Sequence, residues 1–392
     1  MYDFDTIVTR HNINSLKWDC DSNTLPMWVA DMDFKSPPFL LEGMRKRLDN
    51  GTFGYNIIPD EWYSAYQNWW FKRHHFTIEK EWLLFSIGVV ASISSIVRKL
   101  TSVAENVVVQ TPVYNIFFNS ILNNGRNVLE SKLIYKNGEY RIDFHDLEAK
   151  LADPQTSLMI LCNPHNPIGK IWTRDELIKI GDLAKKYNVI VLSDEIHCDL
   201  CDPGLEYIPF ASLNDTCREV SITCVAPTKT FSIAGLQTSA IIVPNAYLRH
   251  KVWRGINTDE VAEGNTFAVI APSLVYNDDG ARWLDELRTY LYKNKQYVIK
   301  TLAKELPMVK VISSAATYLL WIDCSQITDN TKELVHFLHN EYGLWLCEGE
   351  EYGKNGASFI RMNIATQSVR VVEGVERFSK GIKAYLNRKE GI

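Results

Sequence analysis

The stretch from Val220 to Gly235 reads V-S-I-T-C-V-A-P-T-K-T-F-S-I-A-G. Its first six residues are rich in β-branched side chains, which is typical of a buried strand, and Pro227 ends that strand. Lys229 then follows among small residues, where its amine can lose solvation. A desolvated amine has a lowered pKa and can attack a carbonyl carbon. The alternative is that Lys229 is a solvated surface residue, as most lysines are.

Strands and helices alternate around this stretch from about residue 80 onward. The expected strands are 83–87, 107–110, 158–162, 189–193, 220–225 and 240–243, and the expected helices include 89–100 and 173–187. Thr173 and Glu176 have the spacing of a capping box at the start of the second helix. This order predicts an α/β fold whose mostly parallel sheet is flanked by helices.

The pattern changes after about residue 244. A long helix is expected over 282–306, followed by a smaller α/β layer, and residues 1–37 are expected to form an irregular arm. We therefore expect two domains. The large domain is 46–289, and the small domain consists of 1–45, with the arm, and 290–392.

The composition argues against several classes of function. The chain has 392 residues, a net charge of −5 and no basic run longer than Arg45-Lys46-Arg47, so neither nucleic acid nor a membrane surface is an expected partner. No apolar run approaches the length of a membrane span, and the N-terminus lacks the apolar core of a secretion signal. We expect a cytoplasmic protein whose eight cysteines are reduced.

The cysteine and histidine spacings predict no metal site. Cys198 and Cys201 form a single C-x-x-C pair without the second pair that a zinc site of this type requires. The nine histidines show no H-E-x-x-H spacing, and His74 and His75 are expected on the surface of a helix.

Four features fall at the carboxyl ends of the expected strands, where open parallel sheets bind their ligands. They are Gly88-Val89-Val90, the N-P-H-N-P-I-G segment over 163–169, Asp194 and Lys229. Gly88 at a strand-to-helix turn frees backbone N–H groups for an anion such as phosphate, although one glycine there can also be only a turn.

Three side chains at this edge each have two interpretations. Asp194 ends an apolar run and would need a cation or a protonated nitrogen when buried, or else it caps a helix. Asn166 is an amide held rigidly between two prolines, or part of an ordinary turn. Tyr114 is a stacking partner for a flat ring, or a core aromatic.

Together these residues offer an amine for a Schiff base, a carboxylate for a ring nitrogen, an amide for a ring oxygen, an aromatic ring and a phosphate cradle. Those are the groups that pyridoxal 5′-phosphate requires of a protein. The set and its order along the chain therefore predict this cofactor.

At these residues the chain resembles the fold-type I, aspartate-aminotransferase-like superfamily of pyridoxal-phosphate enzymes, and within it the MalY/PatB-type branch of cystathionine β-lyases and C–S lyases. The motifs are M-W-V-A-D-M-D-F (27–34), F-G-Y (53–55), L-C-N-P-H-N-P-I-G (161–169), S-D-E-I-H (193–197), P-T-K-T-F-S-I-A-G (227–235) and R-M-N-I-A (361–365). The resemblance spans nearly the whole chain and implies the fold-type I transferase fold.

The resemblance also implies a role for each residue around the cofactor ring. Lys229 would carry the cofactor covalently, Asp194 would pair with the ring nitrogen, and Asn166 would bind the ring oxygen. His197 would lie near the same oxygen, and Tyr114 would stack on the ring. Lys229, Asp194 and Tyr114 would be the catalytic residues.

The implied phosphate site uses the backbone N–H groups of Val89 and Val90 and the hydroxyl of Thr228. Tyr55 would reach the phosphate of the neighbouring subunit, which implies a homodimer with shared active sites. No metal is implied. The substrate would be an amino acid bound as a small molecule.

Arg361 would take the substrate α-carboxylate bidentately, although an arginine in a strand is more often a surface residue. Ala30 and Asn166 would complete the substrate site. Two positions depart from the superfamily pattern: Ala226 stands where a serine is common and Gln237 where an arginine is common. Both departures would weaken neutralisation of the phosphate charge.

The branch implies α,β-elimination, in which L-cystathionine, L-cysteine or a related cysteine S-conjugate gives pyruvate, ammonia and a thiol. A class I/II aminotransferase would use every residue named above, so the local motifs leave both reactions open and only the branch resemblance favours the lyase. A regulatory or binding protein on the same fold is a third possibility. The intact Lys229, Asp194 and Arg361 argue against it.

Overall fold

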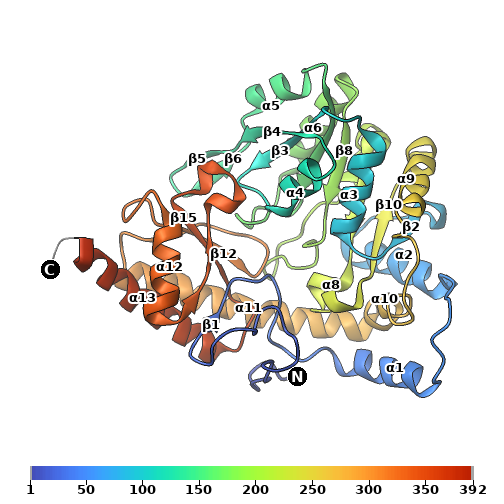
Figure 1. Cartoon of the computed structure of the whole chain (residues 1–392). Coiled ribbons are helices and arrows are strands. Elements are labelled where there is room, and N and C mark those ends of the chain that lie inside the picture. Colours follow the sequence, from blue (N-terminus) through green and yellow to red (C-terminus); the bar gives the residue numbers. More distant parts are fainter. Residues whose placement is uncertain (1, 390–392) are drawn as a thin grey trace.

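The computed structural model describes residues 2–389, and a seven-stranded sheet lies in its larger part (Figure 1). In spatial order the strands are β2 (Leu83–Ser86), β10 (Ser239–Ile242), β9 (Ser221–Val225), β8 (Ile190–Asp194), β7 (Thr156–Cys162), β3 (Asn106–Thr111) and β4 (Asn127–Lys132). β10 runs antiparallel to both of its neighbours, and the other adjacent pairs are parallel. The predicted mostly parallel sheet is therefore confirmed.

Helices cover both faces of this sheet. One face packs against α3 (Val89–Leu100), α4 (Ile116–Leu122) and α9 (Ala246–Thr258), and the other packs against α5 (Phe144–Leu151) and α6 (Arg174–Lys186). Along β7, Leu158 and Ile160 belong to the first cluster, whereas Met159 and Leu161 belong to the second. Successive side chains of a strand point to opposite faces, so a strand covered on both sides must be apolar throughout.

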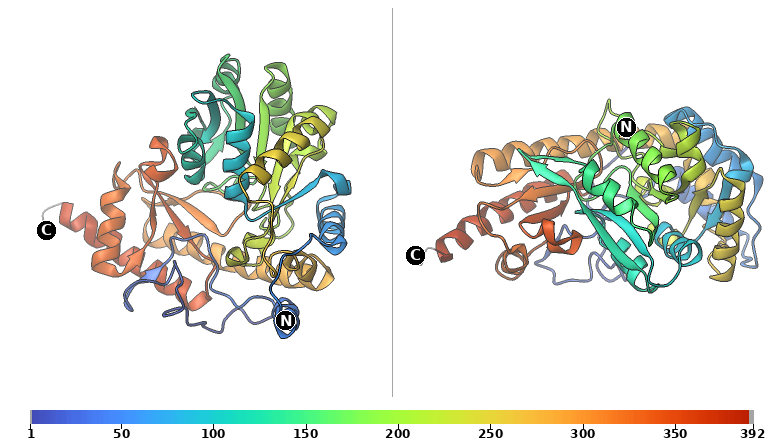
Figure 2. Two further views of the ribbon diagram at one scale, coloured as in Figure 1. Left: turned by 45° about the vertical axis from the view of Figure 1, so that its right-hand side comes forward. Right: turned by 90° about the horizontal axis from the view of Figure 1, so that it is seen from above.

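The C-terminal part of the chain forms a second, four-stranded antiparallel sheet beside the first (Figure 2). Its strands are β11 (Lys310–Val311), β12 (Leu319–Asp323), β15 (Phe359–Asn363) and β14 (Cys347–Glu348), covered by α12 (Thr331–Tyr342) and α13 (Ser368–Lys389). The long helix α11 (Asp278–Glu305) runs beneath both parts (Figure 1). It begins four residues before the predicted start because the Asn277 side chain caps it, accepting from the N–H of Gly280.

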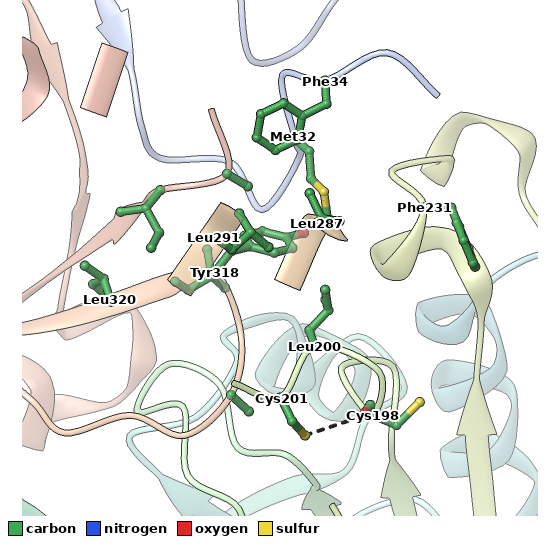
Figure 3. Packing of buried hydrophobic residues seen from close by; sticks show 14 of the residues in the cluster. Met32, Phe34, Cys198, Leu200, Cys201, Phe231, Leu287, Leu291, Tyr318 and Leu320 are labelled. Atoms are coloured by element: carbon green, nitrogen blue, oxygen red, sulfur yellow. Dashed lines mark hydrogen bonds between the residues drawn. The ribbon is translucent and has the colours of Figure 1, made fainter. Parts of the chain in front are cut away.

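The N-terminal arm, residues 2–37, lies across α11 and is tied to the C-terminal part. Its single short strand β1 (Leu25–Pro26) pairs in parallel with β13 (Leu344–Trp345). The Phe4 ring packs edge-on against Trp283 of α11 at 5.5 Å, and Figure 3 shows Met32 and Phe34 directed toward the same helix near Leu287. The irregular arm expected from the sequence is present, and Asn363 of β15 binds it by donating to the carbonyls of Val29 and Asp31.

Several elements were not anticipated from the sequence, among them α4, α5, α9 and β4. β4 is an edge strand with the mixed composition N-V-L-E-S-K, so no apolar run marks it. The remaining elements are α1 (Pro38–Asp49), α2 (Asp60–His74), β5 (Ile134–Lys136), β6 (Glu139–Arg141), α7 (Asp215–Val220), α8 (Pro227–Thr230) and α10 (Ala271–Val275). Between residues 2 and 389 no helix has both the length and the apolar character needed to cross a bilayer.

Candidate active site

A cavity of about 200 Å³ opens at the carboxyl ends of β7, β8 and β9. Nine of the eleven residues that the sequence singled out for the site line it: Ala30, Val89, Val90, Tyr114, Asn166, Asp194, His197, Thr228 and Lys229. They come from the arm, from the ends of β3, β7 and β8 and from the first turns of α3 and α8. Arg361 and Tyr55 do not line the cavity.

Lys229 reaches the cavity because the chain turns sharply after β9. Pro227 occupies the first position of α8, which suits its fixed φ, and places Lys229 in that short helix two residues later. The Nζ atom donates a hydrogen bond of 2.7 Å to the carbonyl oxygen of Ala30. Burial lowers the pKa of Lys229 to about 8; the charges of Asp31 and Asp194 oppose this shift, and that of Arg361 adds to it.

Asp194 is the last residue of β8 and lies between β7 and β9 in the sheet. Its carboxylate is buried and accepts a hydrogen bond of 3.1 Å from the N–H of Ile196. Burial raises the pKa of Asp194 to about 7, although this hydrogen bond and the charge of Lys229 act against the rise. A turn follows Asp194, not a helix, so the helix-cap interpretation is wrong.

Arg361 lies next to the cavity, on the central strand β15 of the small sheet. It is only 4% exposed, so the surface interpretation of this arginine is wrong. Its Nη2 donates to the carbonyl of Trp28 at 2.8 Å, and its Nη1 lies 3.4 Å from Oδ1 of Asn166. The guanidinium also stacks on the Tyr352 ring at 4.9 Å. Asn166 therefore connects the arginine to the cavity.

His197 and Tyr114 supply the ring systems of the cavity. Burial, followed by the charges of Lys229 and Arg361, lowers the pKa of His197 to about 3, so the imidazole is neutral. Its Nδ1 is buried and has no hydrogen-bond partner among residues 2–389. A buried polar atom of this kind is a candidate contact for a ligand. Tyr114 packs edge-on against Phe117 and presents its ring to the cavity.

The end of the cavity near α3 is suited to an anion. Gly88 has an extended backbone and precedes α3, whose first residues are Val89 and Val90. The N–H groups of a helix's first turn have no intrahelical acceptor, and the helix dipole places positive potential there. Thr228, at the start of α8, lines the same cavity.

Tyr55 lies elsewhere. It is fully exposed on the loop between α1 and α2 and belongs to a separate surface depression with Phe53, Thr266 and Phe267. Within one chain it does not meet the other predicted site residues.

Two residues of this region were not assigned a role from the sequence. The Tyr318 hydroxyl donates to the carbonyl of Ala30 at 3.2 Å, beside the bond from Lys229. Asp31 follows Ala30, and its Oδ1 accepts a hydrogen bond of 3.1 Å from the hydroxyl of Ser232. Two aspartates in the otherwise apolar run M-W-V-A-D-M-D-F were the available signal for Asp31; nothing in the sequence distinguishes Tyr318 from a core aromatic.

The expectation that His74 lies on the surface of a helix is wrong. Its side chain is only 6% exposed, and its Nε2 lies 2.9 Å from Oδ1 of Asp199. The ligand atoms of His74, Cys198 and Asp199 lie within 4.8 Å of one another, which is close enough to hold a metal ion. The Asp199 carboxylate is, however, already engaged by Trp69 and Thr230 as well as His74. Hydrogen bonding thus accounts for its burial, and the absence of a metal site stays a prediction.

Comparison with known proteins identifies the family. The model of the aminotransferase class I and II family matches residues 34–378. The chain belongs to this family. It is similar to cystathionine β-lyase PatB of Bacillus subtilis, with 41% identity covering 97% of this chain and 99% of the relative. It is also similar to protein MalY of Escherichia coli, with 30% identity covering 98% and 100%.

Family membership extends to the three-dimensional structure. Cystalysin from Treponema denticola, whose crystal structure contains pyridoxal 5′-phosphate, superposes with a TM-score of 0.95. The sequence identity is 34%, and the match covers 98% of this chain and 99% of cystalysin. The fold is therefore the fold-type I fold expected from the sequence.

Proposed function

We propose that the protein is a pyridoxal-phosphate-dependent carbon–sulfur β-lyase. Its substrates would be L-cystathionine, L-cysteine or related cysteine S-conjugates, and the products pyruvate, ammonia and a thiol. The observation that carries the proposal is the meeting of the partly buried Lys229 amine and the buried Asp194 carboxylate in one cavity at the N-terminus of α3. The lyase names of the similar proteins support the type of reaction.

The residues present fit this cofactor. Within residues 2–389 the buried Asp194 carboxylate forms no salt bridge, and a protonated ring nitrogen would supply a cationic partner. The unpartnered Nδ1 of His197 and the amide of Asn166 suit the ring oxygen. Tyr114 can cover the ring, and the first N–H groups of α3, with Thr228, suit the phosphate.

When bound, pyridoxal phosphate supplies an electron sink for the carbanion that forms at the substrate Cα. The protein's residues provide the rest. Arg361 would hold the α-carboxylate with its fixed fork of donors. The Lys229 amine, neutral in part near pH 8, would take the proton from Cα. The Cβ–S bond would then break with its electron pair on sulfur, and water would convert the released enamine to pyruvate and ammonia.

Asp194 and His197 would support this chemistry through their protonation states. The ionised Asp194 carboxylate would keep the adjacent ring nitrogen protonated, which removes the cost of burying the carboxylate alone. Burial, and after it repulsion by the charges of Lys229 and Arg361, lowers the pKa of His197. The lowered pKa of His197 thus favours the neutral imidazole.

We also propose a homodimer with shared active sites. Tyr55 is fully exposed and far from its own cavity, which suits a hydroxyl that completes the phosphate site of a neighbouring subunit. This contribution would matter here, because Ala226 and Gln237 stand where relatives of the superfamily carry phosphate ligands.

We further propose the division into a large domain, 46–289, and a small domain of 1–45 and 290–392. The two separate sheets and the pairing of β1 with β13 support it. The boundary at 289/290 falls inside α11, so this helix would join the two domains. Residues 1 and 390–392 lie outside the described part of the chain. Eight free cysteines support a cytoplasmic location.

The test of the reaction is incubation with L-cystathionine without any keto acid. We expect pyruvate and a free thiol in equal amounts. The family also contains aminotransferases, which would instead transfer the amino group to an added keto acid. Amino transfer without pyruvate would overturn the lyase proposal. A protein that binds no cofactor and does neither reaction would favour a regulatory role.

A further inference from the structure

The arm touches the lysine segment, Pro227–Gly235, through two side chains of that segment. Besides the bond from Lys229 to Ala30, the Ser232 hydroxyl donates to Oδ1 of Asp31 at 3.1 Å. The backbone N–H of Met32 donates to the same hydroxyl oxygen at 3.2 Å. Three consecutive arm residues, 30–32, are therefore bound to the segment that carries the amine.

Asp31 is fixed from its other side as well. Its Oδ2 accepts from Nη2 of Arg10 at 2.5 Å, and its backbone carbonyl accepts from Lys17 and from Asn363 of β15. One carboxylate oxygen is thus bonded to Arg10 of the arm, and the other is bonded to Ser232 of the lysine segment. Asp31 is the point at which the arm, the small sheet and the lysine segment are joined.

Ser232 occupies a backbone conformation that serines rarely adopt. Its φ is +55°, in the left-handed region, where a residue with a Cβ atom is less stable by roughly 1–2 kcal/mol. Glycine would adopt this conformation without that cost. A serine in this strained conformation suggests a function for its hydroxyl, and both of its hydrogen bonds go to the arm.

The amine of Lys229 faces few charges. The charged side chains that affect it are Asp31 from the arm, Asp194 from β8 and Arg361 from β15, and the neutral polar groups around it include His197, Tyr114 and Tyr318. Among these, Asp31 opposes most strongly the fall in the pKa of Lys229 that burial causes.

We propose that Asp31 and Ser232 form a latch that holds the arm, with the Asp31 carboxylate, beside Lys229. Asp31 and Ser232 are positioning residues, since they act through Ala30 and Lys229. The inference rests on the proposed role of Lys229. Its tests use no substrate turnover, so they give a result whether or not the lyase proposal holds.

The first test is Ser232→Gly, which removes the hydroxyl without backbone strain. The matched control is Asn188→Gly, which relieves a surface residue with a similar φ of +56°. In the full-length holoprotein we expect the Met32 amide to exchange with deuterium about ten-fold faster in S232G, as the loss of one hydrogen bond allows. The control should leave it unchanged. Unchanged Met32 exchange in S232G, or an equal rise throughout α11, would overturn the latch.

The second test is Asp31→Asn, which keeps the shape and removes the charge. Trace acetylation of Lys229 in the cofactor-free full chain, followed by mass spectrometry across pH, reports the fraction of neutral amine. Loss of an opposite charge lowers an amine pKa by at least about one unit, so labelling at pH 7 should rise roughly five-fold. An acetylation profile identical to that of the wild type would overturn the placement of the Asp31 carboxylate beside the amine. The S232G measurement decides the latch even if D31N does not fold.

Discussion

The side-chain nitrogen of Lys229 lies 2.7 Å from the carbonyl oxygen of Ala30, although 199 positions of sequence separate the two residues. The amine after the end of β9 is thereby covered by the N-terminal arm, which itself pairs with β13 and is bound by Asn363 of the small sheet. Burial of the amine, and with it the reactivity of Lys229, therefore depends on both sheets being in place.

Replacing Lys229 with alanine should remove the covalent attachment of the cofactor. We expect elimination to slow by about a hundred-fold to ten-thousand-fold, which is the typical contribution of a positioned base. Borohydride reduction of the wild type, followed by peptide mapping, should place the cofactor mass on Lys229. The exposed Lys304 on α11 offers a control. The Lys304→Ala variant should retain its activity and should still carry the cofactor mass on Lys229 after reduction. Cofactor mass on any other lysine would refute the assignment.

Asp194 should make the stability of the cofactor-free protein dependent on pH. Its folded pKa of about 7 exceeds the unfolded value, so the unfolded chain releases the proton first as pH rises. Stability is then lost between about pH 4 and pH 7, by at most about 4 kcal/mol for a shift of this size.

Asp194→Asn removes this buried charge. Without cofactor it should melt at a higher temperature than the wild type at pH 8 and at nearly the same temperature at pH 4. With cofactor bound, the order at pH 8 should reverse, because only the carboxylate pairs with the ring nitrogen. Thermal melts under these conditions check the prediction; a wild type that is the more stable at pH 8 without cofactor would contradict it.

Arg361→Lys should weaken substrate binding while leaving the cofactor in place. Lysine keeps the charge but cannot reproduce two parallel hydrogen bonds to a carboxylate. We expect kcat/KM for L-cystathionine to fall by about ten-fold to a hundred-fold, with an unchanged visible absorbance spectrum. Arg254→Lys on α9 is the control. Wild-type kcat/KM in R361K would remove Arg361 from the substrate site.

Shared active sites can be tested with hybrid dimers. Tyr55→Ala and Lys229→Ala should each be nearly inactive alone. If Tyr55 serves the neighbouring subunit, a hybrid of the two variants contains one intact site and one site with both defects. Random reassociation should restore about a quarter of wild-type activity. A mixture that stays inactive, although hybrids are detected by mass spectrometry, would mean that the site lies within one subunit.

Much of the large sheet could be predicted from local sequence. A strand buried on both faces is apolar throughout, so β7, β8 and β9 appear as continuous runs, and the turn residues after them mark where ligands bind. The capping box of Thr173 and Glu176 placed α6 in the same way, and both of its reciprocal hydrogen bonds are present. The edge strand β4 was missed because its polar side chains carry no such pattern.

The residues that complete the site were harder to predict. Tyr318 bonds to Ala30 across 288 positions of sequence, and Asp31 bonds to Ser232 across 201 positions. No periodicity or spacing encodes a contact of that range. Arg361 likewise could be assigned from a motif, but its burial against Trp28 and Tyr352 depends on how the arm and the small sheet pack.

The sequence by itself determined the order of strands and helices, the amine at position 229, and the carboxylate and amide that accompany it, because each depends on side chains that are near one another in the chain. Only the tertiary structure decided how strongly those groups are buried, which carbonyl the amine meets, and how the arm is held there. Those properties arise from desolvation and from contacts between distant segments, which exist only once the two sheets and the arm have packed together.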